Sequence, residues 1–284
     1  MRVLSFLLLS IILSGTTFGA GITVHVWFAE EAVRRTTGEL HDLLVENIDY
    51  VRNGAIFPDS GYSVHYSEEC HWPGFMNKYF DYIKGGCFEG GKLHLEGECG
   101  GMIAHFFGAI SHGIADLNYD SKFLGKLVEL GYYSDIDPAQ SGDECLDVMA
   151  LTDPNLNIIF NVPAREAMPN LKHLVNVLNS IPLMRGPITE TEVACGVGDV
   201  WWGLMLERIY AQINRNKCAA TAPQWALEHR FDGPGGIDDT ANVILGIWQE
   251  AWIQLTEKPA GSYVPKELKL NGGWPHGTIY WDNK

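Results

Sequence analysis

Hydrophobic residues recur every three to four positions over most of this chain, which is the spacing of amphipathic helices. Six segments follow this pattern and are predicted to be helical: Glu39–Val51, His71–Ile83, Met102–Tyr119, Asn170–Ile181, Thr189–Ile213 and Ile237–Leu255. We expect Gly54 to stop the first of them. Strand-like alternation is scarce, and glycine-rich stretches such as residues 85–101 and 233–236 separate the helices. The pattern therefore predicts an all-α, single-domain fold.

The segment Met102–Tyr119 differs from the others because it is apolar or small on nearly every side. Its large apolar members are Ile103, Phe106, Phe107, Ile110 and Ile114. A helix that is hydrophobic all round is buried on all faces. We predict that this segment is the central helix of the bundle.

The first residues have the composition of a targeting segment rather than of a folded element. Arg2 is followed by an apolar run from Val3 to Leu13 and then by small residues up to Ala20. This order is typical of a secretory signal peptide. We expect a signal peptide at residues 1–19 and a single secreted domain at residues 20–284, with an uncleaved anchor as the alternative.

Six cysteines, an even number in a chain expected to be secreted, predict three disulfides. Two pairs are close in sequence and leave a third: Cys87 with Cys99, Cys195 with Cys218, and Cys70 with Cys145. Other connectivities remain open, and a thiolate metal ligand at Cys70 or Cys145 is the competing interpretation.

The formal net charge of −15 changes the choice of partners. It argues against nucleic-acid backbones and anionic membrane surfaces as bulk partners, because like charges repel. A phosphate ester can still bind where the site supplies its own positive charge, and a metal cluster is such a site.

The predicted central helix carries side chains of the kind that bind metals. His112 and Asp116 are four residues apart, so they project from one face of the helix and can reach the same ion. Asp120 continues this stripe by one turn, and His105 precedes it by two turns. Burying such groups without a partner is costly, and a metal ion would satisfy them. A polar helix edge facing solvent is the alternative.

Two further segments are candidates to supply the same site. Phe57-Pro58-Asp59 follows a predicted helix and presents Asp59 from a rigid corner, and His71 opens the next helix beside Trp72. A lone Asp or His in a turn is more often structural than ligating. The prediction of one joint site therefore depends on their occurrence together with His112 and Asp116.

Several motifs occur in a specific order along the chain. They are Gly-Ile-Thr-Val-His at 21–25, Gly-Ala-Ile-Phe-Pro-Asp at 54–59, Ser-Glu-Glu-Cys-His-Trp at 67–72, Phe-Gly-Ala-Ile-Ser-His-Gly-Ile-Ala-Asp at 107–116, Ser-Gly-Asp at 141–143 and Gly-Ile-Asp-Asp at 236–239. This order resembles the N-terminal catalytic domain of the glycosylphosphatidylinositol-specific phospholipase D family. That family belongs to the wider zinc-dependent phospholipase C and single-strand nuclease superfamily. The resemblance implies a helical bundle of that type with three metal ions.

The resemblance also implies roles for individual residues. The implied metal ligands are Ala20, His25, Asp59, His71, His112, Asp116 and Asp143. Asp116 would bridge two ions, and Asp59 would be the catalytic base for the attacking water. Aromatic residues interleave with these segments, and we expect Tyr66, Trp72 and Phe75 to bind substrate, with core packing as the alternative.

Two positions depart from the family pattern. Asp120 and Ala139 stand where the family has histidines, so the ion held near Asp143 would lose its imidazole ligands. A site rich in oxygen ligands favours magnesium, manganese or calcium over zinc. We expect two zinc sites, and a third site that is weak or filled by a different divalent cation, with Asp120 among its ligands.

By this resemblance the chain would be a secreted phosphodiesterase that hydrolyses phospholipids or glycosylphosphatidylinositol anchors with a metal-activated water. We expect a monomer that contacts membrane surfaces transiently and binds no nucleic acid. Two alternatives stay open: a catalytically weakened lipid- or phosphate-binding homologue, and a single-strand nuclease.

Overall fold

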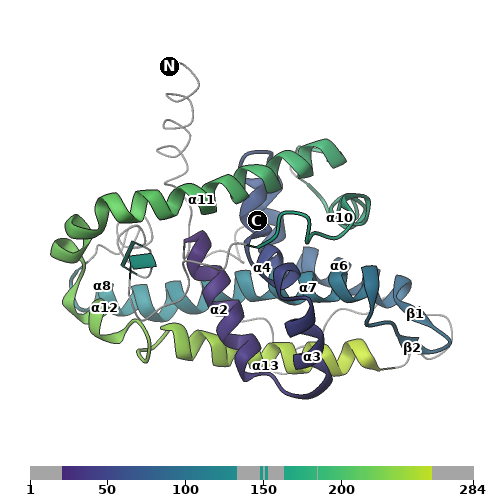
Figure 1. Cartoon of the computed structure of the whole chain (residues 1–284), viewed down its shortest axis with the longest axis horizontal. Coiled ribbons are helices and arrows are strands. Elements are labelled where there is room, and N and C mark those ends of the chain that lie inside the picture. The colour runs from purple at the N-terminus through teal and green to yellow at the C-terminus, as the bar shows by residue number, and fades with distance from the viewer. Residues whose placement is uncertain (1–20, 133–147, 150, 153–162, 184, 258–284) are drawn as a thin grey trace.

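The protein is described by a computed structural model, which covers residues 21–132, 148–149, 151–152, 163–183 and 185–257. Within these residues the regular secondary structure is helical apart from a hairpin of two-residue strands, β1 (Phe88–Glu89) and β2 (Lys92–Leu93) (Figure 1). The predicted all-α fold is confirmed. The expected signal peptide lies outside the described residues.

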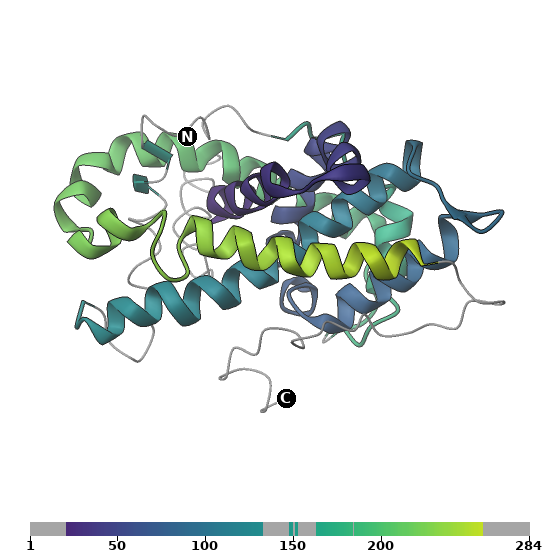
Figure 2. The same cartoon turned by 90° about the horizontal axis from the view of Figure 1, so that it is seen from below.

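The helices of the described residues follow one another in this order: α2 (Ile22–Arg35), α3 (Gly38–Glu46), α4 (Ile48–Ile56), the 3₁₀ turn η1 (Pro58–Gly61), α5 (Ser67–Cys70), α6 (Pro73–Gly86), α7 (Gly97–Asn118), the π-helical turn η2 (Tyr119–Leu124), α8 (Gly125–Glu129), α10 (Leu171–Leu178), α11 (Glu190–Thr221), α12 (Gln224–His229) and α13 (Ile237–Thr256). In Figure 1, α11 lies along one edge of the molecule and α13 along the opposite edge. Helix α7 runs between them, and Figure 2 shows α13 nearest the viewer. None of these helices is long and apolar enough to cross a bilayer.

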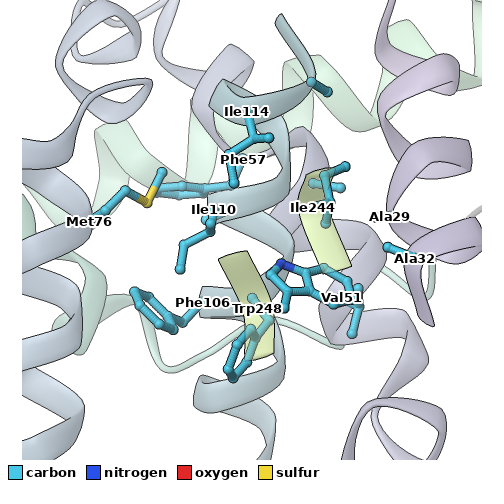
Figure 3. Close-up of a cluster of buried hydrophobic side chains, with 14 of the residues drawn as sticks. Ala29, Ala32, Val51, Phe57, Met76, Phe106, Ile110, Ile114, Ile244 and Trp248 are labelled. Atoms are coloured by element: carbon cyan, nitrogen blue, oxygen red, sulfur yellow. The ribbon is translucent and has the colours of Figure 1, made fainter. Parts of the chain in front are cut away.

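Helix α7 is the central buried helix that the sequence predicts. It packs against α2, α4, α6 and α13. Figure 3 shows Phe106, Ile110 and Ile114 of α7 beside Ile244 and Trp248 of α13, and none of the five is more than 1% exposed. The core therefore forms around α7, and the elements that carry His25 and Asp59, α2 and η1, both pack on this helix.

Glycines bring α4 into backbone contact with α7. A Cβ on Gly54 would lie 2.1 Å from the carbonyl oxygen of His105, and one on Gly108 would lie 2.1 Å from that of Val51. The expectation that Gly54 stops a helix is therefore wrong, because its missing side chain serves this contact and α4 continues to Ile56. The predicted helix Glu39–Val51 is instead divided at Asn47, whose side-chain amide donates to the carbonyl of Leu43.

The remaining helix predictions are confirmed with shifted ends. Helix α7 begins earlier than predicted, at Gly97, and α11 extends past Ile213 to Thr221. Thr189 starts α11 through a capping box with Glu192, in which each side chain bonds the other's backbone N–H. The pattern did not predict α2, whose buried residues surround the helix rather than forming one stripe.

The disulfide predictions are confirmed for one pair and wrong for two. Cys87 and Cys99 are bonded and tie the hairpin to the start of α7. Cys195 is free and exposed, whereas Cys218 is disulfide-bonded. Both lie on α11, where 23 residues span about 35 Å, far beyond the reach of a disulfide. Cys70 is free and fully buried, so it does not pair with Cys145, which lies outside the described residues.

Candidate metal centre

Five side chains that the sequence proposes as ligands meet inside the bundle. They are His25, Asp59, His71, His112 and Asp116, and none is more than 8% exposed. Buried carboxylates and imidazoles are costly unless they are paired or bind a metal.

In each element, a local feature of the backbone places the ligand side chain in the site. His112 and Asp116 lie one turn apart on α7, as their spacing predicts. Pro58 opens the 3₁₀ turn η1 directly after α4, and this turn directs Asp59 inward. His71 stands between α5 and the Pro73 that begins α6, and His25 lies in the first turns of α2.

Two carboxylate oxygens lie close to a pair of imidazole nitrogens. His71 Nε2 and His112 Nε2 are 2.9 Å apart, and each lies 3.6 Å from Asp59 Oδ1. Asp116 Oδ2 lies 3.6 Å from His71 Nε2 and 3.4 Å from His112 Nε2. Tetrahedral zinc with bonds of about 2.0–2.1 Å separates its ligand atoms by about 3.3 Å. The spacing therefore fits an ion of this size.

The other ring nitrogen of each facing imidazole makes a hydrogen bond that orients the ring. His71 Nδ1 lies 2.7 Å from the carbonyl oxygen of Ser67, and His112 Nδ1 lies 2.7 Å from that of Ala55. A ring that donates its proton from Nδ1 keeps a lone pair on Nε2. Two neutral rings would thus direct lone pairs at each other, which is unfavourable unless a cation or proton lies between them. Metal-binding histidines are oriented through the second nitrogen in this way.

Asp116 also connects this cluster of ligand atoms to His25. His25 Nε2 lies 3.1 Å from Asp116 Oδ1, and the His25 ring stacks on that of His112 with centroids 3.7 Å apart. Among the described residues, His25 Nδ1 has no hydrogen-bond partner. One carboxylate thus presents its two oxygens to two adjacent groups of ligands, as a carboxylate that bridges two ions does.

The charges of the cluster also favour a cation. Burial disfavours the ionised carboxylate of Asp116, but His25 and His112 outweigh burial and lower its pKa to about 2. The pKa of Asp59 is likewise lowered against burial, by His112 and His71. Burial and the neighbouring His25 lower the pKa of His112 to about 4. Burial lowers that of His71 too, but Asp59 and Asp116 raise it to about 9. Without a metal, His71 therefore carries a compensating proton at neutral pH, and Asp116 also raises the pKa of His25 against burial.

Four other proposed positions lie elsewhere or outside the described residues. Asp120 is partly exposed in η2, and its carboxylate belongs to neither ligand group formed by the described residues. Ala20 and Asp143 lie outside the described residues. His105 faces the core, where it packs on the ring of Phe57 and lies 3.2 Å from the Tyr79 hydroxyl. Burial lowers the pKa of His105 to about 3, so it is a neutral core histidine.

The aromatic residues proposed for substrate binding are mostly core residues. Tyr66 is fully buried, with its hydroxyl 2.6 Å from Ser60 Oγ, and Phe75 stacks on Phe57. The expectation that Tyr66 and Phe75 bind substrate is therefore wrong, because both rings pack in the core. Trp72 is partly exposed, and its ring lies 6.1 Å from that of His71.

Glu207 of α11 was not predicted but lies beside the centre. Its carboxylate accepts a hydrogen bond from Thr23 Oγ1 in the first turn of α2, where Gly21 offers no side-chain cap. Burial raises the pKa of Glu207 to about 7, and the nearby charge of Asp59 acts in the same direction. One sequence signal could have indicated Glu207: it lies at helical spacing between the buried residues Leu204 and Ala211.

Comparison with known proteins finds relatives of one kind. Over 182 residues the chain is 29% identical to phosphatidylinositol-glycan-specific phospholipase D of Mus musculus, which covers 58% of this chain and 21% of the relative. The proteins of the same name from Rattus norvegicus and Bos taurus are 27% and 26% identical over 54% and 52% of this chain. The match thus spans about a fifth of the relatives' length. No family model and no solved structure matches. These similarities support a relation to that phospholipase family.

Proposed function

We propose that this chain is a secreted, metal-dependent phosphodiesterase of the zinc-dependent phospholipase type, acting on phospholipids or glycosylphosphatidylinositol anchors. The pair of facing imidazole nitrogens between two buried carboxylates carries the proposal, because that arrangement fits a divalent cation. The similarity to phosphatidylinositol-glycan-specific phospholipase D supports the lipid phosphodiester as the substrate class.

His71, His112, Asp59 and Asp116 would hold one zinc ion, and His25 would contribute with Asp116 to a second. Bound dications lower the pKa of a coordinated water and neutralise the phosphoryl oxygens. The family that this chain resembles has three ion sites. We propose that the third, near Asp120 and Asp143, is weak or takes a harder cation because its imidazoles are replaced.

The chain's own residues have two roles in this reaction: Asp59 accepts a proton, and backbone carbonyls fix the imidazoles. Asp59, ionised through its lowered pKa, accepts a proton from the attacking water as the water oxygen forms its bond to phosphorus. The bond from phosphorus to the leaving oxygen breaks in line, and solvent returns a proton to that oxygen. The Nδ1 bonds to Ser67 and Ala55 keep the imidazoles fixed, so the site needs little rearrangement during the reaction.

Secretion is part of the same proposal. The apolar run at residues 3–13 supports a signal peptide at residues 1–19. The disulfide between Cys87 and Cys99 supports an oxidising compartment, where such bonds persist. We propose that the secreted domain acts as a monomer that touches the membrane only while it turns over its lipid substrate.

The test is hydrolysis by the purified secreted chain. We expect cleavage of phosphatidylcholine, phosphatidylinositol or a lipid-anchored reporter, loss of cleavage with a chelator, and recovery with zinc. Asp59→Asn should lower kcat by about 100-fold or more, since it removes the proton acceptor. Cleavage of single-stranded DNA but of no lipid would favour the nuclease alternative. Zinc binding with no cleaved diester would favour the weakened homologue, whose best support is Asp120 and Ala139 in place of histidines.

A further inference from the structure

Helix α11 packs over η1 and α2, the two elements outside α7 that begin the candidate centre. A Cβ on Gly196 would lie 2.2 Å from the carbonyl oxygen of Ser60 in η1, and one on Gly203 would lie 3.3 Å from Cδ1 of Ile22 in α2. These short distances place α11 directly against both elements. Glu207 is four residues after Gly203 and therefore lies on the same side of the helix.

The first turn of α2 has no side-chain cap of its own. Gly21 is its N-cap residue, and the Gly21 carbonyl oxygen accepts the N–H groups of Val24 and His25 at 2.9 and 3.1 Å. The N–H groups that precede these have no acceptor within the helix. Glu207 supplies one from outside, because its carboxylate accepts hydrogen bonds from the hydroxyl and from the backbone N–H of Thr23. A negative charge at this end of α2 also suits the helix dipole.

His25 differs from the other two histidines of the centre in what orients its ring. His71 and His112 each make a hydrogen bond from Nδ1 to a backbone carbonyl. His25 Nδ1 has no such partner among the described residues. The position of this ring is therefore set by where the first turn of α2 lies and by stacking on His112. A contact that fixes this turn also fixes the ligand.

We propose that Glu207 is a positioning residue for the second zinc site, because it holds the first turn of α2 in the place from which His25 reaches Asp116. This inference rests on the proposed function, which assigns His25 and Asp116 to a second ion. Glu207 belongs to neither ligand group formed by the described residues, so it acts through His25 rather than by binding the ion. Groups that orient a metal ligand typically change metal affinity by about 10- to 100-fold.

Two other roles for Glu207 lead to different expectations. Glu207 lies near enough to Asp59 for their charges to interact, so its negative charge could attract cations to the whole centre. A contact that only stabilises the fold would not select one ion. The positioning role alone predicts that the second ion is affected, that the first is not, and that an uncharged acceptor can replace the carboxylate.

The test measures the affinities of both zinc ions in the full secreted chain by competition with a chelator. Glu207→Ala removes the acceptor, so we expect the second ion to bind at least about tenfold more weakly and the first to stay within about twofold. Glu207→Gln keeps an oxygen for the bonds from Thr23, and both affinities should stay within about threefold of the wild type. Glu190→Ala removes an exposed carboxylate from the same helix and should change neither affinity.

Thr23→Val tests the same contact from the other side. It removes the hydroxyl and keeps the shape of a side chain that is 2% exposed, so it should weaken the second ion as well. The double variant should lose little more than Glu207→Ala alone, because both changes break one interaction. A metal-free measurement is hydrogen exchange in a chelator: the amides in the first turn of α2 should exchange at least about tenfold faster in Glu207→Ala than in the wild type.

The outcomes separate this proposal from the proposed function. Equal zinc affinities in Glu207→Ala and the wild type would overturn the positioning role and leave the proposed function standing. Equal weakening in Glu207→Ala and Glu207→Gln would assign the effect to charge, and weakening of both ions together would assign it to the fold; either result overturns the proposal, as does a wild type that binds only one ion. Selective loss of the second ion in Glu207→Ala, in a chain that hydrolyses no diester, would support the positioning role and overturn the proposed function.

Discussion

His71 and His112 make the same hydrogen bond to a backbone carbonyl, yet their pKa values shift in opposite directions. His71 lies between Asp59 and Asp116, which raise its pKa to about 9 against burial. For His112, burial and the neighbouring His25 prevail, and its pKa falls to about 4. The pair therefore shares one proton at neutral pH, in the position where a cation would lie.

Metal binding should displace that proton. The pKa of His71 is raised above its ordinary value of 6.5. Its protonation therefore stabilises the metal-free fold fully below pH 6.5, and this contribution is lost as the pH rises through about 9. We expect zinc binding at pH 7 to release at least one proton, and zinc affinity to increase up to about pH 9. Calorimetry in buffers of different ionisation enthalpy measures the release, and binding without proton release would contradict this account of His71.

Glu207 gives a second test at the scale of residues. Its pKa of about 7 lies above the ordinary value of 4.5, so the folded state binds more protons between these pH values and stability falls as the pH rises through them. Glu207→Gln keeps an oxygen to accept the bond from Thr23 and removes the buried charge. We expect the variant to unfold at a higher temperature than the wild type at pH 8, and at nearly the same temperature at pH 4.5. Calorimetry in a chelator checks this, and a variant less stable than the wild type at pH 8 would count against the buried charge.

The ligands could be predicted where local spacing decides geometry. The four-residue interval between His112 and Asp116 fixes one helix face, and Pro58 fixes the corner that presents Asp59. The stripe of Leu204 and Ala211 indicates that Glu207 faces inward, but it could not assign Glu207 to the site, because that depends on the packing of α11 on α2. Tyr66 was misassigned because an aromatic residue near a site looks the same in sequence whether it packs in the core or meets a substrate.

At the scale of elements, the contact between α4 and α7 is made by glycines and can be tested through them. Gly54→Ala would place a Cβ 2.1 Å from the carbonyl oxygen of His105, so the helices must separate. We expect a loss of about 2–3 kcal/mol in the free energy of unfolding, measured by denaturant titration. Gly246→Ala is the matched control in α13, where nothing lies within 4 Å of the new Cβ. It should stabilise the fold by up to about 1 kcal/mol, and equal effects of the two changes would contradict the packing described.

Hydrophobic periodicity predicted most of the helices but not where they begin, break and end. The break at Asn47 and the continuation through Gly54 depend on which glycines meet another backbone, and that is a tertiary property. The same limit explains the cysteines. Cys195 and Cys218 looked like neighbours in sequence, but a continuous helix holds them about 35 Å apart.

At the scale of the whole molecule, average charge proved a poor guide to local surfaces. The chain carries a net charge of −15, yet the exposed charged side chains in the last two turns of α11 are Arg215 and Lys217. The same acidity includes Asp59 and Asp116, whose negative charge the centre uses to attract cations. The net charge of a chain therefore excludes a class of binding partner only after the charge of each surface and cavity is known.

The central claim is that Asp116 joins two metal sites, and zinc stoichiometry tests it most directly. Mass spectrometry of the secreted wild-type chain after zinc loading should find at least two tightly bound zinc ions. Asp116→Asn should retain at most one, while Asp199→Asn, an exposed carboxylate on α11, should match the wild type. A wild-type chain that binds no zinc, or an Asp116→Asn chain with full zinc content, would contradict the account.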